Sequence, residues 1–185
     1  MAEGPLAKLA AEEGLAVDWM PYELRPEPVP LPDLSGSALE QSRQKWASGV
    51  GVMAERYGMD MRPPTSKPRS RKAHEAAEYA RERGLFEPFR LALFKAYFGE
   101  DRDIGQVDVL VDVGGSVGLD AADLRHALES DRMREQLLQL EAVSQQLGVR
   151  AVPTIVIGNY AVEGAQPLEV LRRVLQQARA QQIPD

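Results

Sequence analysis

The sequence has no cysteine among its 185 residues. Without a thiol it forms no disulfide bond, holds no thiolate-bound metal and offers no cysteine nucleophile. It has only two histidines, His74 and His126, which stand far apart in the sequence and without an H-E-x-x-H motif or a cluster of carboxylates beside them. We therefore expect no metal site and no catalytic residue among these residues, and ordinary helix positions for both histidines.

Positive charge is scarce as well, since 22 lysines and arginines are outnumbered by 28 aspartates and glutamates, and the net charge is -6. Nucleic acids and anionic membranes bind concentrated basic surfaces, so we expect neither as a partner. The one basic run, residues 67–72, opens a predicted helix and is interpreted as a solvated face. No apolar run reaches the roughly 18 residues of a membrane helix. The first residues also lack the pattern of a signal peptide, and together these absences predict a cytoplasmic protein.

The composition that remains, 44% hydrophobic and 27% charged, is typical of a globular domain. The most informative stretch is 148–167, which predicts a turn at Pro153, a short strand, a Gly-Asn hairpin loop, a second strand and a helix that begins at Pro167. An X-Pro bond is the only peptide bond with an accessible cis form. A cis bond here would turn the main-chain groups of Ala151 and Val152 outward, as an edge for an extended ligand.

Elsewhere the spacing of apolar residues predicts mainly helices, with one strand at 15–24 that carries Val17, Trp19 and Tyr22. Trp19 and Tyr22 are interpreted as core residues. Proline-rich connectors are expected at 25–36 and 62–68. Helices are predicted at 4–13, 37–57, 70–83, 85–98, 120–129, 131–147 and 167–181.

Several details of these helices are also predicted. Ser37 and Glu40 form a capping-box pattern, and Asp120 and Asp131 are expected helix caps. The helix at 85–98 is apolar around most of its circumference and should be largely buried. The apolar spacing within 37–57 predicts a buried stripe used for packing: Trp46, Val50, Met53 and Tyr57.

Residues 106–118 stay ambiguous at this level. Their valines alternate as in a strand, while their place between helices indicates a helix. The glycines at the end of this stretch, at positions 114, 115 and 118, fit neither a dinucleotide fingerprint nor a P-loop, so no phosphate site is expected.

The order of elements is a mixed α/β pattern with a helical insertion, which is the layout of the second half of a thioredoxin-type fold. The residues resemble the DsbA-like thioredoxin-fold proteins, and among them the FrnE-like branch, which is related to the 2-hydroxychromene-2-carboxylate isomerases. The matches run in order along nearly the whole chain: VDWMPYELRP at 17–26, AH at 73–74, LFKAYF at 93–98, DI at 103–104, GLD at 118–120, GV at 148–149, VPT at 152–154 and VEGAQP at 162–167.

This resemblance implies an α/β, thioredoxin-like fold of the DsbA type, in which residues 1–34 and 148–185 make an incomplete thioredoxin-like domain and residues 35–147 a helical insertion. Pro153 would be the cis-proline beside the active site, and the groove would take an extended peptide or a small thiol. The implied substrate-binding residues are Ala151, Val152, Pro153, Thr154, His74 and Gln166.

The chain differs from the family at the catalytic motif. The family's Cys-x-x-Cys lies at the start of the first helix, after the first strand, where its thiolate attacks a disulfide. This sequence begins inside that helix, so the first strand of the sheet and the cysteines are both missing. Either Met1 is an internal methionine of a longer oxidoreductase, or the protein has lost redox chemistry and kept a peptide- or thiol-binding groove. The first explanation is favoured, because the absent strand would leave two strand edges unpaired, through which the chain would be unstable or form a homodimer.

A third class is a glutathione-dependent isomerase of the 2-hydroxychromene-2-carboxylate type, which resembles the same fold and needs no cysteine pair. Glutathione would then be its cofactor, and none is expected otherwise. The residues at 164–166 favour the FrnE-like branch over this class.

Overall fold

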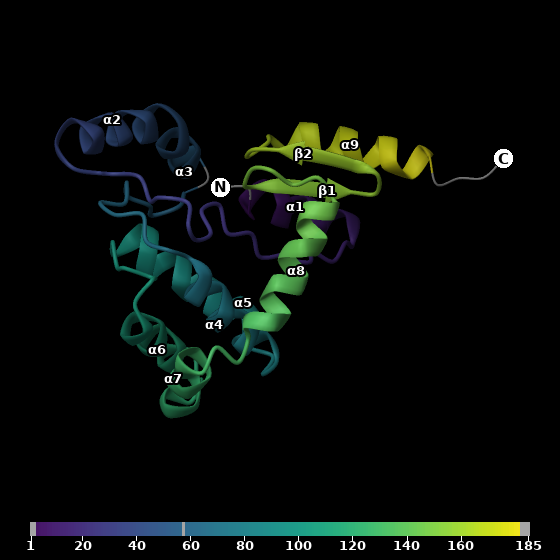
Figure 1. Cartoon of the computed structure of the whole chain (residues 1–185). Helices are drawn as coiled ribbons and strands as arrows, with labels where there is room; N and C mark the ends of the chain where they lie inside the picture. Colours follow the sequence, from purple (N-terminus) through teal and green to yellow (C-terminus); the bar gives the residue numbers. More distant parts are fainter. Residues whose placement is uncertain (1–2, 57, 182–185) are drawn as a thin grey trace.

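The computed structural model describes residues 3–56 and 58–181, and shows a β-hairpin flanked by helices, with a further group of helices to one side of it (Figure 1). None of the helices in these residues is long and apolar enough to cross a membrane. The helices are α1 (Glu3–Glu13), α2 (Gly36–Trp46), α3 (Val52–Arg56), α4 (Arg71–Arg81), α5 (Phe86–Phe94), α6 (Val107–Ser116), α7 (Ala121–Glu129), α8 (Arg134–Gln146) and α9 (Leu168–Ala180). Two π-helical turns, η1 (Ala47–Gly51) and η2 (Lys95–Gly99), continue α2 and α5.

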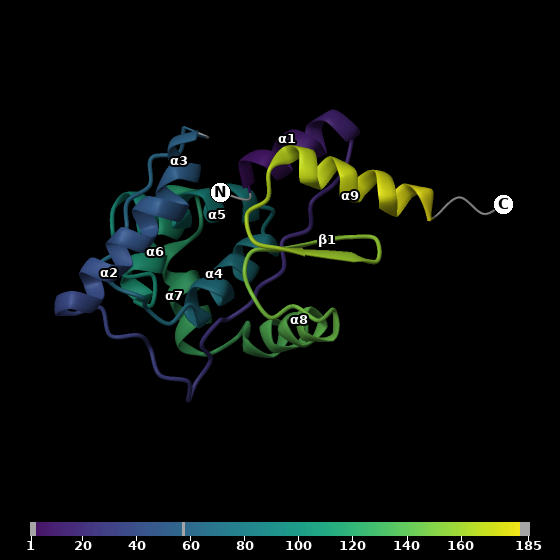
Figure 2. The same cartoon turned by 90° about the horizontal axis from the view of Figure 1, so that it is seen from above.

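The hairpin consists of β1 (Thr154–Ile157) and β2 (Tyr160–Glu163), which pair antiparallel. Its two-residue loop contains Gly158 at a φ of 58°, a conformation that glycine adopts without strain. In Figure 2, α1 and α9 lie on one side of the hairpin and α8 lies on the other. The hairpin, its loop and the following helix are therefore as the sequence predicted.

A small core joins the hairpin to α1 and α9. Ile155 of β1 and Leu9 of α1 are buried together with three leucines of α9. At the surface, Arg172 pairs with Glu12 at 2.5 Å and Arg179 with Glu13 at 2.6 Å, which links the same two helices. The three leucines are Leu168, Leu171 and Leu175.

A larger, separate core lies among the helices α4 to α7. Tyr79 and Phe89 are fully buried there, with Leu110, Leu124 and Leu128 around them. The ambiguous stretch 106–118 belongs to this core as α6, because its buried residues recur with helical spacing.

The C-terminal turn of α6 depends on a glycine. A methyl group at Gly114 would lie 2.5 Å from Cδ2 of Leu124 and 3.3 Å from Cδ1 of Leu119. Leu124 is itself fully buried and has little room to move. This contact lets α6 and α7 approach closely.

Gly114→Ala is therefore expected to lower the free energy of unfolding by about 1–2 kcal/mol through overpacking, as measured by urea denaturation. Gly115→Ala is the matched control, because a methyl group there meets nothing within 4 Å. It should be neutral or slightly stabilising, since alanine favours a helix over glycine. Equal stability of both variants would contradict the close packing of α6 on α7.

The predicted strand at 15–24 is wrong. Residues 15–23 form no regular secondary structure and Leu24 lies in a bend. Burial alternates along 17–24, yet no strand among the described residues pairs with them. A strand needs a neighbouring strand to complete its ladder of main-chain hydrogen bonds. Here, side chains of α4 and α8 bond to some of these main-chain groups instead.

Two helix caps were also predicted wrongly, whereas Asp120 does cap α7 by accepting from the main-chain N–H of Asp123 at 2.8 Å. Helix α2 begins at Gly36 after Ser35, so Ser37 is inside the helix, where it cannot cap the first turn. Asp131 lies in a turn before α8, at a φ of 54°, and its carboxylate binds Lys72 instead.

The two long helices differ from their predictions as well. The helix predicted at 37–57 is present over the described residues as α2, η1 and α3 in direct succession, but its apolar stripe is only half-buried at these positions; Tyr57 lies outside the described residues. Trp46 packs near Phe98 of η2, with ring centres 5.8 Å apart. The helix predicted at 85–98 is not largely buried, since Leu91 is 51% and Phe94 43% exposed.

Candidate functional site

The turn before β1 contains a residue, Val152, whose main-chain groups bond to no other described residue. The Val152–Pro153 peptide bond is cis. The Thr154 hydroxyl donates to the carbonyl of Ala151 at 2.7 Å, and the N–H of Gly164 donates to the carbonyl of Pro153 at 2.7 Å. Val152 is 46% exposed, and no described residue bonds to its N–H or C=O. Hydrogen bonds therefore hold the turn at Ala151 and at Pro153, on either side of Val152, whose own main-chain groups are not bonded.

Gln166 supports the end of the hairpin. Its side-chain amide donates to the carbonyl of Glu163, the last residue of β2, at 2.7 Å. The predicted residues Ala151 to Thr154 and Gln166 therefore belong to one structural unit, the hairpin and its two flanking turns.

His74 belongs to a different part of the molecule. It lies in the first turn of α4, which packs against α5, α6, α7 and α8. Burial lowers the pKa of its imidazole from 6.5 to about 4, so the ring is neutral at physiological pH. Among the described residues, no hydrogen bond or ion pair joins this ring to the hairpin.

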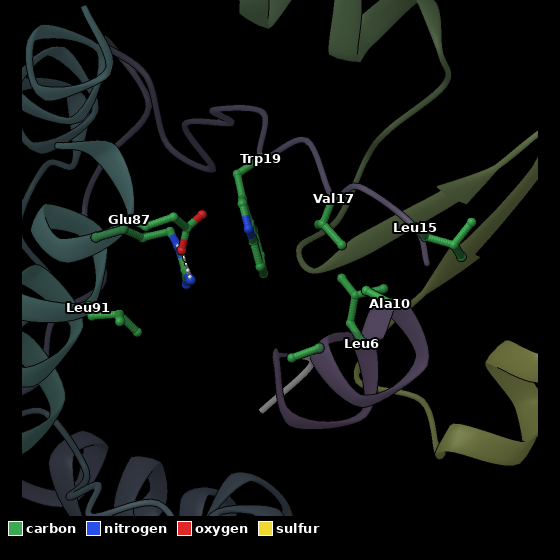
Figure 3. Close-up of a pocket in the computed structure, with 9 residues that line it drawn as sticks. Leu6, Ala10, Leu15, Val17, Trp19, Glu87 and Leu91 are labelled. Atoms are coloured by element: carbon green, nitrogen blue, oxygen red, sulfur yellow. Dashed lines mark hydrogen bonds and ion pairs between the residues drawn. The ribbon is translucent and has the colours of Figure 1, made fainter. Parts of the chain in front are cut away.

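An apolar hollow of about 380 Å³ lies between α1, the residues that follow it, and α5 (Figure 3). Trp19 stands in the middle of the view, with Glu87 and Leu91 on one side and Val17 and Leu6 on the other. The complete lining is Leu6, Ala7, Ala10, Leu15, Val17, Trp19, Glu87, Arg90 and Leu91. These residues were not predicted as a site, and Trp19 was interpreted as core.

Two charged residues line the hollow, Arg90 and Glu87, and they pair with each other. Arg90 is 8% exposed and donates to a carboxylate oxygen of Glu87 at 2.7 Å. Its guanidinium carbon lies 4.4 Å from the centre of the Trp19 ring, a cation–π contact. With its charge matched by Glu87, this wall favours an apolar or aromatic group over an anion.

The hollow and the turn lie near the same helix end. Figures 1 and 2 both place the start of α1 beside the turn that leads into β1. The N-terminal end of a helix carries partial positive charge and stabilises an adjacent anion such as a thiolate. No group of three or more acidic or histidine side chains among residues 3–56 and 58–181 is placed to hold a metal ion.

Comparison with known proteins places this geometry in context. Residues 1–176 match the family described as a DSBA-like thioredoxin domain. YwbO of Bacillus subtilis is 31% identical over 178 residues, which cover 92% of this chain and 88% of YwbO.

Two solved structures are also similar. A probable DsbA oxidoreductase from Streptomyces coelicolor has a TM-score of 0.83 at 25% identity, over 100% of this chain and 86% of its own. A 2-hydroxychromene-2-carboxylate isomerase has a TM-score of 0.76 at 20% identity, over 97% of this chain and 89% of its own, and at that identity the likeness shows the fold alone.

Proposed function

The chain belongs to the DSBA-like thioredoxin domain family, and on this premise we propose that it acts in thiol–disulfide exchange by holding an extended cysteine-containing peptide against residues 151–154. The similarity to the Streptomyces protein, described as a DsbA oxidoreductase, supports this reaction class. The fold is of the DsbA-like thioredoxin type, mostly helical with a small hairpin.

The observation that carries the proposal is the free main chain of Val152. An extended peptide laid beside the turn pairs with its unoccupied N–H and C=O groups, while Thr154 and Gly164 keep the turn in shape. The apolar hollow offers a place for one side chain of the same peptide.

The sulfur chemistry needs thiols from outside these 185 residues, because the sequence has no cysteine. A thiolate brought between the turn and the start of α1 is stabilised by the helix dipole. It attacks the substrate disulfide, forms a mixed disulfide with one sulfur and releases the other as a thiolate. The role of this chain is to hold and orient the substrate for that step.

Val152→Asp is expected to weaken binding of a fluorescein-labelled, extended, cysteine-containing peptide about tenfold, because it puts a negative charge beside the pairing edge and loses an apolar contact. Fluorescence anisotropy measures this affinity. Val156→Asp on β1 is the matched control, since Val156 is also a valine and is 42% exposed, but lies beyond the turn. Equal loss in both variants, or none in either, would refute binding at the turn.

The glutathione-dependent isomerase is distinguished by a second measurement. We expect the chain to pass through a column of immobilised glutathione without retention. Retention that free glutathione reverses would favour the isomerase instead. In an insulin-reduction assay without added thiol, the chain alone should show no activity, since it has no sulfhydryl group.

A further inference from the structure

Helix α8 buries two polar side chains on the face that packs against the residues after α1. Its buried residues are Leu137, Glu141 and Ser144, which recur with helical spacing. Glu141 is only 9% exposed, and Ser144 donates to the main-chain oxygen of Pro21 at 3.4 Å. Glutamate is seldom buried unless another group pairs with it, so Glu141 has to be explained by its neighbours.

A second buried carboxylate, that of Glu23, meets Glu141 at this place. The N–H of Glu23 donates to Glu141 at 3.1 Å, and the side chain of Glu23 is 2% exposed. Arg71, at the start of α4, donates to Oε2 of Glu23 at 3.1 and 3.0 Å. The other oxygen of this carboxylate, Oε1, is buried and bonds to no described residue. A buried acceptor without a donor is costly, and a proton carried by Glu141 would supply the donor.

The two carboxylates share one cation. The charged groups that act on Glu141 are Glu23, from the residues after α1, and Arg71, from α4. The other buried carboxylates of α4 have cations of their own, Lys72 for Glu75 and Arg81 for Glu78. Two buried carboxylates beside a single cation favour holding one proton between them. Because Arg71 bonds to Glu23, Glu141 is the carboxyl group that takes up the proton.

This acid pair, Glu23 and Glu141, lies at a joint between two parts of the molecule. The core among α4 to α7 is separate from the core of the hairpin, α1 and α9. The residues between them are fastened by polar groups, as where Arg81 of α4 donates to the main-chain oxygen of Trp19 at 2.7 Å. Burial of apolar groups does not depend on pH, whereas a contact between two carboxyl groups does. The joint is therefore a place at which a proton can act.

We propose that the acid pair is a pH-sensitive switch, which fastens residues 19–23 to α8 in mild acid and loosens them as the pH rises. When Glu141 is protonated, its O–H donates to Oε1 of Glu23 while its other oxygen accepts from the N–H of Glu23, so hydrogen bonds run in both directions. When the proton passes to the solvent, two carboxylates face each other, and only the bond from the N–H remains.

The direction of the effect follows from the pKa of Glu141. Burial raises it above the ordinary value of 4.5, and the hydrogen bond from the main chain of Glu23 opposes this shift. The folded chain therefore holds the proton at pH values where the unfolded chain has lost it. The stabilisation is complete below pH 4.5 and is lost as the pH rises through the raised pKa. Since the buried His74 changes overall stability in the opposite sense, the test measures the joint itself.

Two signals from the full chain test the switch by nuclear magnetic resonance. The carbon-13 shift of the Glu141 carboxyl, assigned by its loss in Glu141→Gln, should titrate above pH 4.5. The protection factor of the Glu23 amide against hydrogen exchange should fall about fivefold across that titration, which is the typical weight of one hydrogen bond. A carboxyl that titrates at or below 4.5, or a protection factor that stays constant, would overturn the proposal.

Two glutamine variants of α8 separate the switch from ordinary surface charge. Glu141→Gln carries the neutral form at every pH, because its amide oxygen accepts from the N–H of Glu23 and its NH₂ group donates to Oε1. Protection of the Glu23 amide should then stay high across the range. Glu135→Gln is the matched control, since Glu135 is an exposed glutamate of the same helix, and it should keep the pH dependence of the unaltered chain.

The remaining outcomes also decide the question. If Glu141→Gln loses protection at Glu23 at every pH, or does not fold at neutral pH as judged by urea denaturation, then the charged carboxylate holds the joint and the proposal is wrong. If Glu135→Gln abolishes the pH dependence as Glu141→Gln does, the effect comes from the overall charge of α8, and the acid pair is not the switch.

Discussion

Arg71→Met is expected to lower the free energy of unfolding by about 3 kcal/mol, because it leaves a buried carboxylate without its cation. The Arg71 guanidinium donates from Nε and Nη2 to Glu23 at 3.1 and 3.0 Å, and the Glu23 side chain is 2% exposed. A second carboxylate, that of Glu141, lies close enough to accept from the main chain of Glu23. Burial, opposed by that hydrogen bond, raises the pKa of Glu141.

Urea denaturation at neutral pH measures this loss, and limited proteolysis should show faster cleavage within residues 18–27. Arg125→Met is the control, since it removes an arginine from a surface pair with Asp108 and should leave the unfolding midpoint nearly unchanged. An Arg71→Met chain as stable as the unaltered chain would mean that the Glu23 carboxylate is not held by this pair.

The pH dependence of stability should show the second large effect, at His74. The pKa of its imidazole is about 4 in the folded chain and 6.5 as the ordinary value, because burial disfavours the charged ring. The unfolded chain therefore takes up a proton at this residue between pH 6.5 and 4, and the folded chain does not. The contribution of His74 to the free energy of unfolding is complete above pH 6.5, and it falls by about 3 kcal/mol as the pH drops to 4.

His74→Gln should flatten the loss of stability between pH 6.5 and 4, as measured by urea midpoints at several pH values. His126→Gln replaces the exposed histidine of α7 and should keep the original slope. If the His74→Gln chain loses as much stability over this window as the unaltered one, the ring is not held neutral by burial.

The helices and the hairpin were predictable because their signals are local. Helical spacing, Asp120 as a cap and a Gly-Asn loop act over a few residues. The secondary structure of α6 was not predictable, since alternating valines match both a strand and a buried helix, and the packing of the buried residues of α6 among α4 to α7 decides between them. The strand predicted at 15–24 was wrong because a strand also needs a partner strand, which no local pattern reports.

The candidate site was predictable only in part. The turn at 151–154 follows from Pro153 and the hairpin, and Gln166 is close to it in sequence. The hollow combines Leu6, Trp19 and Leu91 from distant segments, so its assembly depends on tertiary packing. Leu91 lies on a helix that was expected to be buried, and its side chain is exposed instead. Exposed apolar residues of this kind indicate a binding surface, but a sequence pattern cannot show which apolar residues stay exposed.

The place of Trp19 in the hollow has an optical consequence. The sequence has only two tryptophans, and the other, Trp46, packs near Phe98 away from this lining. In a Trp46→Phe chain, all indole emission would come from Trp19, whose ring lies against the guanidinium of Arg90. Quenching or a spectral shift on adding an apolar compound would then report entry into the hollow, without any label attached to the protein.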